Sequence, residues 1–238
     1  SWQTGSIFGP IAGGVIYGIS ENLGYVFASS CLLFGAFLIL SIPKTTNQAK
    51  VKSMTLKNLI MGFSYVWNKK ILLGVISLDL FAVIFAGAIA LLPIYARDIL
   101  ETGPITLGLL RAAPGIGAIL VAILLSRYSI KNNSGLIMLF AVAFFGFFTM
   151  LFGISTNTTL SIIFLCFIGG FDMLSVYIRE IIVQLGTEDK MRGRVNSINM
   201  MFVGASNELG EFRAGMMAFW MGSVPAVFLG GLGAIAIT

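Results

Sequence analysis

The chain alternates between long apolar stretches and short polar intervals. Stretches of about 20 mostly apolar residues recur along it, and such stretches are long enough to cross a hydrocarbon core about 30 Å thick as α-helices. The ten-residue segments of alternating hydrophobicity that indicate a membrane β-barrel do not occur. The pattern predicts an all-α polytopic membrane protein. The predicted spans are 2–19, 25–43, 71–96, 105–126, 136–155, 160–184, 195–221 and 225–238.

One long polar interval, 44–70, separates the first two predicted spans from the rest. It has six lysines and no acidic residue. Between Leu56 and Trp67, apolar residues recur at helical spacing with polar residues on the other face. This spacing predicts an amphipathic helix that lies on the inner membrane surface, with a soluble linker helix as the alternative. The basic residues of the interval are Lys44, Lys50, Lys52, Lys57, Lys69 and Lys70.

The distribution of basic residues predicts the orientation of the chain. Lys and Arg beside membrane spans mark the cytoplasmic side. With 44–70 placed there, all 15 basic residues except Arg97, Arg111 and Arg213 fall on that side of the membrane. The sequence pI of about 9.4 is therefore explained by orientation, and we expect no nucleic-acid partner.

Composition excludes several classes of function. The chain is 57% hydrophobic and 11% charged, against roughly 25% charged in a soluble domain. It has no histidine, and its two cysteines, Cys31 and Cys166, lie inside apolar stretches, so neither a metal site nor a disulfide framework is expected. No P-loop or nucleophile elbow occurs. We therefore expect no enzyme, no cofactor and no ATP hydrolysis.

The first predicted span carries the residues that indicate a family. Gly5-Ser-Ile-Phe-Gly9-Pro10-Ile-Ala-Gly13-Gly14 resembles the G-x-x-x-G-P-x-x-G-G pattern in helix 5 of major facilitator superfamily antiporters. The superfamily has two six-helix halves, each containing 3+3 inverted repeats. The resemblance implies that the chain is the later part of a longer transporter. In that reading 1–43 holds the last two helices of the N-terminal half, 44–70 is the cytoplasmic central loop, and 71–238 is the C-terminal half with a truncated last helix.

Later stretches are similar to one branch of the superfamily, the exporters like the bacterial enterobactin exporter. They begin at Ser77, Leu91, Gly108, Met191 and Gly204. The loop after 105–126 departs from the family pattern, because Ser126 stands where an Asp is expected, so no Asp-centred gate is predicted there. The basic residues of the cytoplasmic loops are candidates for inside-gate pairing or for contact with lipid headgroups. They are Arg127, Lys131, Arg192 and Arg194.

The glycines of the first span predict close helix packing. Gly5, Gly9 and Gly13 repeat every four residues and leave a groove on one helical face. Pro10 lacks a backbone donor and favours a bend. Together with Gly14, we expect this motif to form an outer gate against the small face of 105–126. Ordinary packing by small residues is the alternative.

Six ionisable residues lie deep within the predicted spans. Each costs a few kcal/mol at the bilayer centre, so each needs a partner or a wet cavity. Four acids face two arginines, so at most two acids can pair one-to-one. A carboxyl that takes and loses a proton beside a cavity has the chemistry of proton coupling, whereas a structural role is the alternative for each acid. We expect Arg179 to meet headgroups. The candidates are Asp79, Asp172, Glu208, Glu211, Arg111 and Arg213.

Together these features predict a secondary active transporter in the cell membrane. The resemblance favours proton-coupled export of a small amphipathic molecule, drug-like or siderophore-like, with Na⁺ as the alternative coupling ion. An importer or a lipid flippase on the same fold is the runner-up. A non-transporting sensor or scaffold is the alternative from another class. We expect a monomer in the bilayer.

Overall fold

The structure is a computed structural model that describes residues 2–41, 56–128, 130 and 133–238. Every regular element in these ranges is helical. Lys44, Lys50, Lys52 and Lys131 lie outside the described residues, so their predicted roles stay predictions. The elements are α1 (Trp2–Ile19), α2 (Glu21–Leu40), α3 (Leu56–Asn68), α4 (Lys70–Ala86), η1 (Ala88–Leu91), α5 (Leu92–Ile94), η2 (Tyr95–Ile99), α6 (Pro104–Arg127), α7 (Ser134–Ile154), α8 (Thr158–Gly186), α9 (Arg192–Met221) and α10 (Ser223–Ala236).

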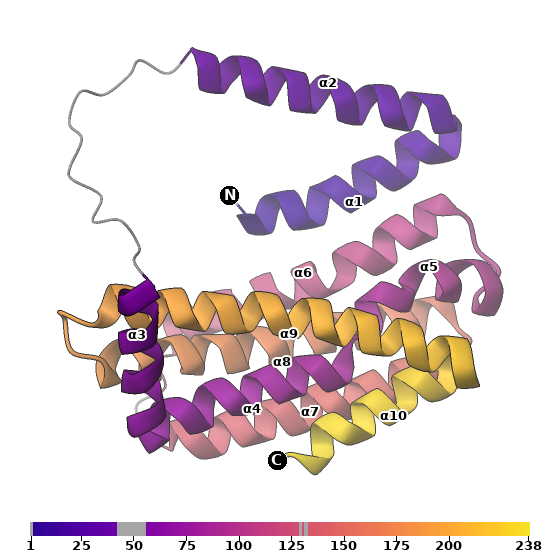
Figure 1. The fold of residues 1–238 in the computed structure, drawn as a ribbon. Helices are drawn as coiled ribbons and strands as arrows, with labels where there is room; N and C mark the ends of the chain where they lie inside the picture. Colours follow the sequence, from indigo (N-terminus) through magenta and orange to yellow (C-terminus); the bar gives the residue numbers. More distant parts are fainter. Residues whose placement is uncertain (1, 42–55, 129, 131–132) are drawn as a thin grey trace.

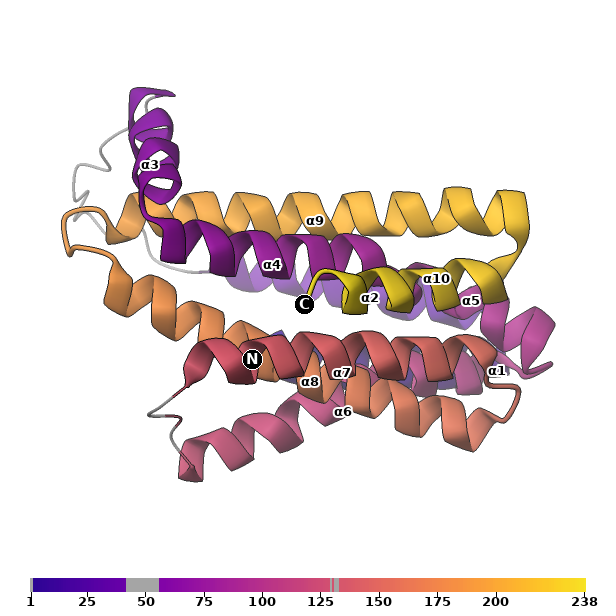
Figure 2. The same cartoon turned by 90° about the horizontal axis from the view of Figure 1, so that it is seen from below.

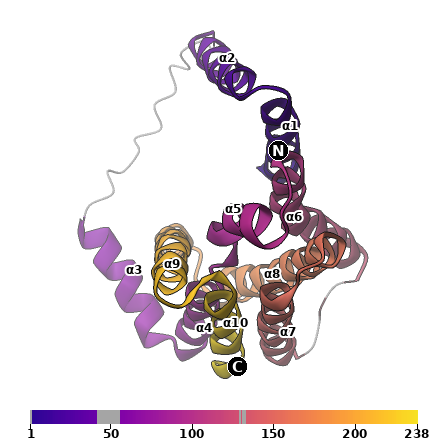
Figure 3. The same cartoon turned by 90° about the vertical axis from the view of Figure 1, so that its right-hand side faces the viewer.

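The long helices lie side by side in a bundle, and successive helices run in opposite directions (Figures 1 and 2). Seen from one end, α4, α7, α8, α9 and α10 form the main body (Figure 3). α1 packs along α6, and α2 packs on α1 at the edge of the molecule. α2 buries none of its residues against the rest of the chain. It is therefore apolar and exposed, as a helix in contact with lipid or with further protein must be.

The predicted spans agree with the observed helices. Except for 71–96, each has a counterpart whose ends differ by a few residues, and the all-α polytopic fold is confirmed. Among the described residues, five helices are long and apolar enough to cross a membrane. α9 has 30 residues, but its polar and charged side chains make it less apolar than those five. Those side chains include three of the six ionisable candidates, Glu208, Glu211 and Arg213.

The span predicted over 71–96 is not continuous. α4 ends at Ala86, and Gly87 adopts an unusual conformation with φ 19° and ψ 18°. A 3₁₀ turn, the short helix α5 and the π turn η2 then carry the chain to Ile99. Glycine tolerates positive φ, and Pro93 in α5 lacks the N–H that would bond to the carbonyl of Ile89 in a continuous helix. The span is therefore a broken helix.

α3 lies across one end of the bundle (Figure 2). Val66 is buried against α4 and α9 in a cluster with Leu72 and Val195, whereas Phe63 and Trp67 are exposed. A helix is present where one was predicted, and its amphipathic role stays a prediction. Its placement on the inner membrane surface stays a prediction. We refer to this side of the molecule as the α3 end.

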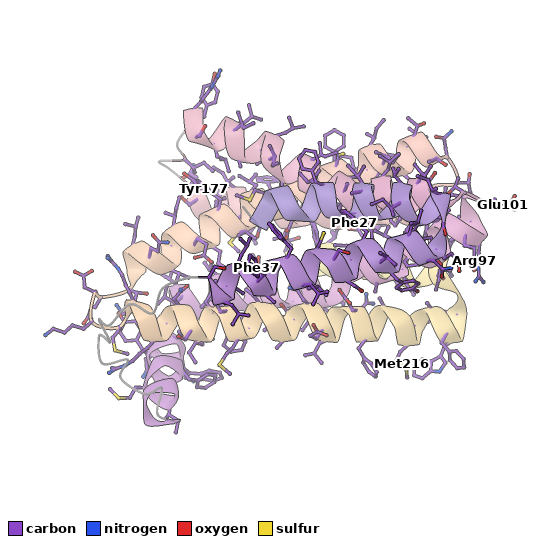
Figure 4. All side chains as sticks on the ribbon, turned by 90° about the horizontal axis from the view of Figure 1, so that it is seen from above. Phe27, Phe37, Arg97, Glu101, Tyr177 and Met216 are labelled. Carbon is purple, nitrogen blue, oxygen red and sulfur yellow. The ribbon has the colours of Figure 1, made fainter. Side chains whose placement is uncertain are left out.

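The two ends of the bundle differ in charge. α4 begins at Lys70, α6 ends at Arg127 and α9 begins at Arg192, all at the α3 end. Arg97 and Glu101 lie at the opposite end (Figure 4). There the Arg97 side chain donates to Asp98 at 2.7 Å. The basic residue at that end is thus offset by a neighbouring carboxylate.

Candidate functional site

A central cavity of about 120 Å³ lies between α4, α6, α7, α8 and α9. Its wall is mostly apolar, but it includes the carboxyl groups of Asp172 and Glu211 and the amide of Asn207. Thr149 also lines it, with its hydroxyl donating to the carbonyl of Phe145 at 2.8 Å. The described residues of the wall include no Lys or Arg. The structure therefore brings together two of the four acids that the sequence singled out.

Glycines bring the helices around this cavity into backbone contact. A Cβ built on Gly210 of α9 would lie 2.7 Å from the carbonyl oxygen of Val83 in α4. A Cβ on Gly169 of α8 would collide with the backbone of Pro114 in α6. Glu211 follows Gly210 directly, and Asp172 follows Gly169 by one helical turn. Both carboxyl groups are therefore placed by positions where the packing has no room for a side chain.

Arg213 has a different environment from the one predicted. Its Nε donates to the carbonyl of Ile84 at 2.8 Å, and its terminal nitrogens donate to the carbonyl of Phe85 and contact the Met217 sulfur. In a continuous helix those two carbonyls would accept from Ala88 and Ile89, and the break removes both donors. A membrane interior leaves no water to replace them. Arg213 therefore caps the broken end of α4 and does not line the central cavity.

Asp79 is buried in an ion pair with Arg179 of α8. Both residues are 4% exposed, and the Ser175 hydroxyl donates to the same carboxylate at 3.3 Å. The expectation that Arg179 meets lipid headgroups is wrong, because its guanidinium turns into the bundle toward α4. Asp79 does not line the central cavity. Its role in proton coupling stays a prediction, with a paired carboxylate in place of a free one.

The remaining two candidates lie apart from the central cavity. Glu208 is exposed on α9 and is not among the residues that line the cavity. Arg111 is exposed on α6 and lines a second cavity of about 610 Å³ between α1, α6 and the segment around Pro93. Tyr17 and Arg97 also line this second cavity. It opens near the end of the bundle that carries Arg97, opposite the α3 end.

The glycine motif packs α1 against α6 through Gly14, a member of the motif, and not through the groove of Gly5, Gly9 and Gly13. A Cβ on Gly14 would lie 2.7 Å from the carbonyl oxygen of Pro104 and 3.1 Å from Cα of Gly108. Gly5, Gly9 and Gly13 have no atom within 4 Å of such a Cβ, so the predicted groove does not make this contact. The small face of α6 is divided in the same way. Gly108 meets α1, whereas Gly117 meets the backbone of α8.

Replacing Gly14 with Leu is expected to separate α1 from α6, because the side chain has no space at the Gly108 contact. A cysteine placed at Leu107, which lines the second cavity, should then react several-fold faster with an impermeant thiol reagent applied at the Arg97 end. Gly9→Leu is the matched control, since that position is open. Equal labelling rates in the two variants would show that the contact does not close this side.

The basic residues at the α3 end make local contacts. Arg192 pairs with Asp189 in the same turn at 2.8 Å, and an Arg194 nitrogen contacts the Met191 sulfur at 3.3 Å. Arg127 is the last residue of α6. Lys69 donates to the carbonyl of Gly186 at 3.3 Å. These contacts do not decide between headgroup binding and inside-gate pairing, so both stay predictions.

Sequence reasoning missed the polar network around Arg179. Asp172, Ser175 and Arg179 are spaced three and four residues apart, which places them on one face of a helix. That spacing could have indicated an inward-facing polar stripe on α8. The partners on other helices, Asp79 and Asn199, could not be identified in this way because the sequence does not state which helices touch.

Comparison with known proteins agrees with this architecture. Enterobactin exporter EntS of Shigella flexneri is 24% identical over 236 residues, which cover 98% of this chain and 52% of that protein. EntS of Escherichia coli O81 (strain ED1a) is 25% identical with the same coverage. The chain thus spans about half the length of the curated relatives it matches, and no solved structure matches it. The family model of the Major Facilitator Superfamily matches residues 1–211, so the chain belongs to that superfamily.

Proposed function

We propose that this chain is part of a secondary active transporter that exports a small amphipathic molecule in exchange for protons. The observation that carries the proposal is the central cavity. Asp172 and Glu211 share it with apolar side chains and with no basic residue among its described lining. A carboxylate without a cationic partner is costly in such surroundings and favours binding a proton.

Export is favoured over import by the kind of relative that matches. The curated relatives are named as enterobactin exporters. This supports a siderophore-like or drug-like substrate for the whole transporter, to which other helices would contribute. An importer or a lipid flippase would use the same cavity. A sensor or scaffold gains nothing from two carboxyl groups in an apolar cavity, so it is the weaker alternative.

Transport by the whole protein in everted membrane vesicles tests the proposal. Candidate compounds should accumulate in the vesicles when a pH gradient, acidic inside, is imposed. The gradient should collapse faster when a transported compound is added. Accumulation driven by a Na⁺ gradient at constant pH would point to the other coupling ion. Accumulation of no compound under either gradient would favour the sensor or scaffold.

We further propose that the α3 end faces the cytoplasm, as the basic residues favour. Cysteines placed at Lys50 or Lys190 should be protected from an impermeant thiol reagent outside intact cells, while cysteines at Thr102 or Thr158 should react. The background protein carries Cys31→Ser and Cys166→Ser, which remove the two natural thiols. Labelling at Lys190 from outside would reverse the orientation.

A further inference from the structure

A buried polar cluster lies between the central cavity and the α3 end, where α4, α8 and α9 meet. It contains two carboxyl groups, Asp79 and Glu180, but a single guanidinium, that of Arg179. Asn199 of α9 completes it by donating from Nδ2 to Oε1 of Glu180 at 2.9 Å. With both carboxyl groups ionised, the cluster carries one negative charge that no basic residue within it balances.

The two carboxyl groups are not equivalent. The Asp79 side chain is 6% exposed and accepts from both Arg179 and Ser175. The Glu180 side chain is 32% exposed, and its contact with Arg179 is 3.5 Å long. Its better hydrogen bond comes from a neutral amide. Of the two carboxyl groups, Glu180 is thus the more exposed one and the one with the weaker contact to Arg179.

The side-chain oxygen of Asn199 offers an acceptor for a protonated Glu180. Its Oδ1 is buried and has no hydrogen-bond partner, although the residue is 1% exposed. A buried acceptor without a donor is rare and costs about 1–3 kcal/mol. The amide oxygen is the acceptor that a Glu180 carboxylic acid requires. An O–H on Oε2 of Glu180 would donate to it, while Nδ2 continues to donate to Oε1.

We propose that Glu180 is a proton-binding site, with the Asn199 amide as the group that recognises its protonated form. The proton comes from water at the α3 end and forms an O–H bond on Oε2, which changes the charge of the cluster from −1 to zero. Glu180 lies eight residues from Asp172 on α8, about 12 Å along the helix. Glu180 would thus be a second proton-binding site, between the central cavity and the α3 end. This role rests on the proposed proton coupling; the site itself does not.

The surrounding charges are consistent with this assignment. The charged groups that face Glu180 are Asp79 from α4 and Arg179 from α8, and α9 contributes the Asn199 amide. Two cations near the α3 end have partners elsewhere in the described structure. Lys69 donates to the carbonyl of Gly186, and Arg192 pairs with Asp189. The contacts of the Glu180 carboxyl group are therefore those with Arg179 and Asn199.

Infrared difference spectra of the whole transporter in lipid, recorded between high and low pH, test the site directly. Protonation of Glu180 should give a carboxylic C=O band that is absent from Glu180→Gln. The Gln side chain can still donate to Oδ1 of Asn199 and accept from its Nδ2, so this variant should fold normally. Glu188→Gln, an exposed acid in the α8–α9 loop, is the matched control and should keep the band. A spectrum of Glu180→Gln identical to that of the wild type would overturn the proposal.

Asn199→Leu separates recognition of the proton from folding. Leu can neither accept from the proposed Glu180 O–H nor donate to Oε1, so both hydrogen bonds of the amide pair are lost. The carboxylic C=O band of Glu180 should therefore move to higher frequency than in the wild type. A band at an unchanged frequency would show that Asn199 does not bind the protonated form. A band that titrates normally in a protein without pH-driven transport would disprove the proposed function and leave the site intact.

Discussion

Asp172→Asn is expected to abolish pH-driven uphill export while leaving downhill exchange of substrate largely intact. Asn keeps the size and the hydrogen-bonding capacity of the side chain but cannot release a proton. Asp172 shares the central cavity with Glu211 and with no described basic residue. Concentrative uptake into everted vesicles should therefore fall to the level of vesicles without the transporter. Exchange at equal pH on both sides should persist.

Related variants rank the acids on α9. Glu211→Gln is expected to impair coupling, because this carboxyl lines the same cavity. Glu208→Gln is expected to have a smaller effect, since both glutamates are exposed but Glu208 does not line the cavity. Asp98→Asn, in the segment at the Arg97 end, is the control. If Asp172→Asn, Glu211→Gln and Glu208→Gln all concentrate substrate as well as wild type, the acids are structural.

Breaking the Asp79–Arg179 pair is expected to destabilise the protein before it affects coupling. Removal of one partner from a buried ion pair leaves an uncompensated charge and costs about 3–5 kcal/mol. Asp79→Asn leaves the Arg179 guanidinium, which is 4% exposed, beside a neutral amide. The thermal unfolding midpoint in detergent should fall by several degrees. The loss of stability has to be measured first, so that a transport defect of this variant can be separated from unfolding.

A double variant distinguishes the pair from either residue alone. Asp79→Asn combined with Arg179→Met removes both charges and keeps the volume nearly constant, so most of the lost stability should return. Recovery of stability without recovery of pH-driven export would place the pair in coupling as well as in folding. A single variant as stable as wild type would contradict the buried pair.

The break in α4 marks a limit of reading spans from hydropathy. Residues 71–96 are apolar apart from Ser77 and Asp79, and the apolar pattern alone favours one continuous helix. Gly87 and Pro93 were visible in the sequence as residues that can interrupt a helix. A break inside a membrane also needs donors for the freed carbonyls. Arg213 provides them from α9, far along the chain, and no local pattern could identify that partner.

The sequence predicted that the glycine motif of α1 packs against α6, but not which glycines make the contact. The spacing of Gly5, Gly9 and Gly13 favoured one helical face for the contact, and the observed contact uses Gly14 and Gly108. That a glycine-rich α1 packs against α6 was foreseen, and the pair does pack together. Which glycines touch depends on how the helices rotate about their axes. Packing of both helices against all their neighbours sets that rotation.

The sequence by itself determined the helical class, the approximate span ends, the presence of a helix at α3 and the family. These properties follow from local apolar runs and residue order, because hydrocarbon requires each span to satisfy its own backbone. Tertiary structure alone decided which ionisable groups meet. It joined Asp172 to Glu211 in one cavity, buried Asp79 with Arg179, and set Arg213 on the broken end of α4. Charges in a low-dielectric interior act over a few ångströms, so their chemistry depends on helix neighbours that the sequence does not specify.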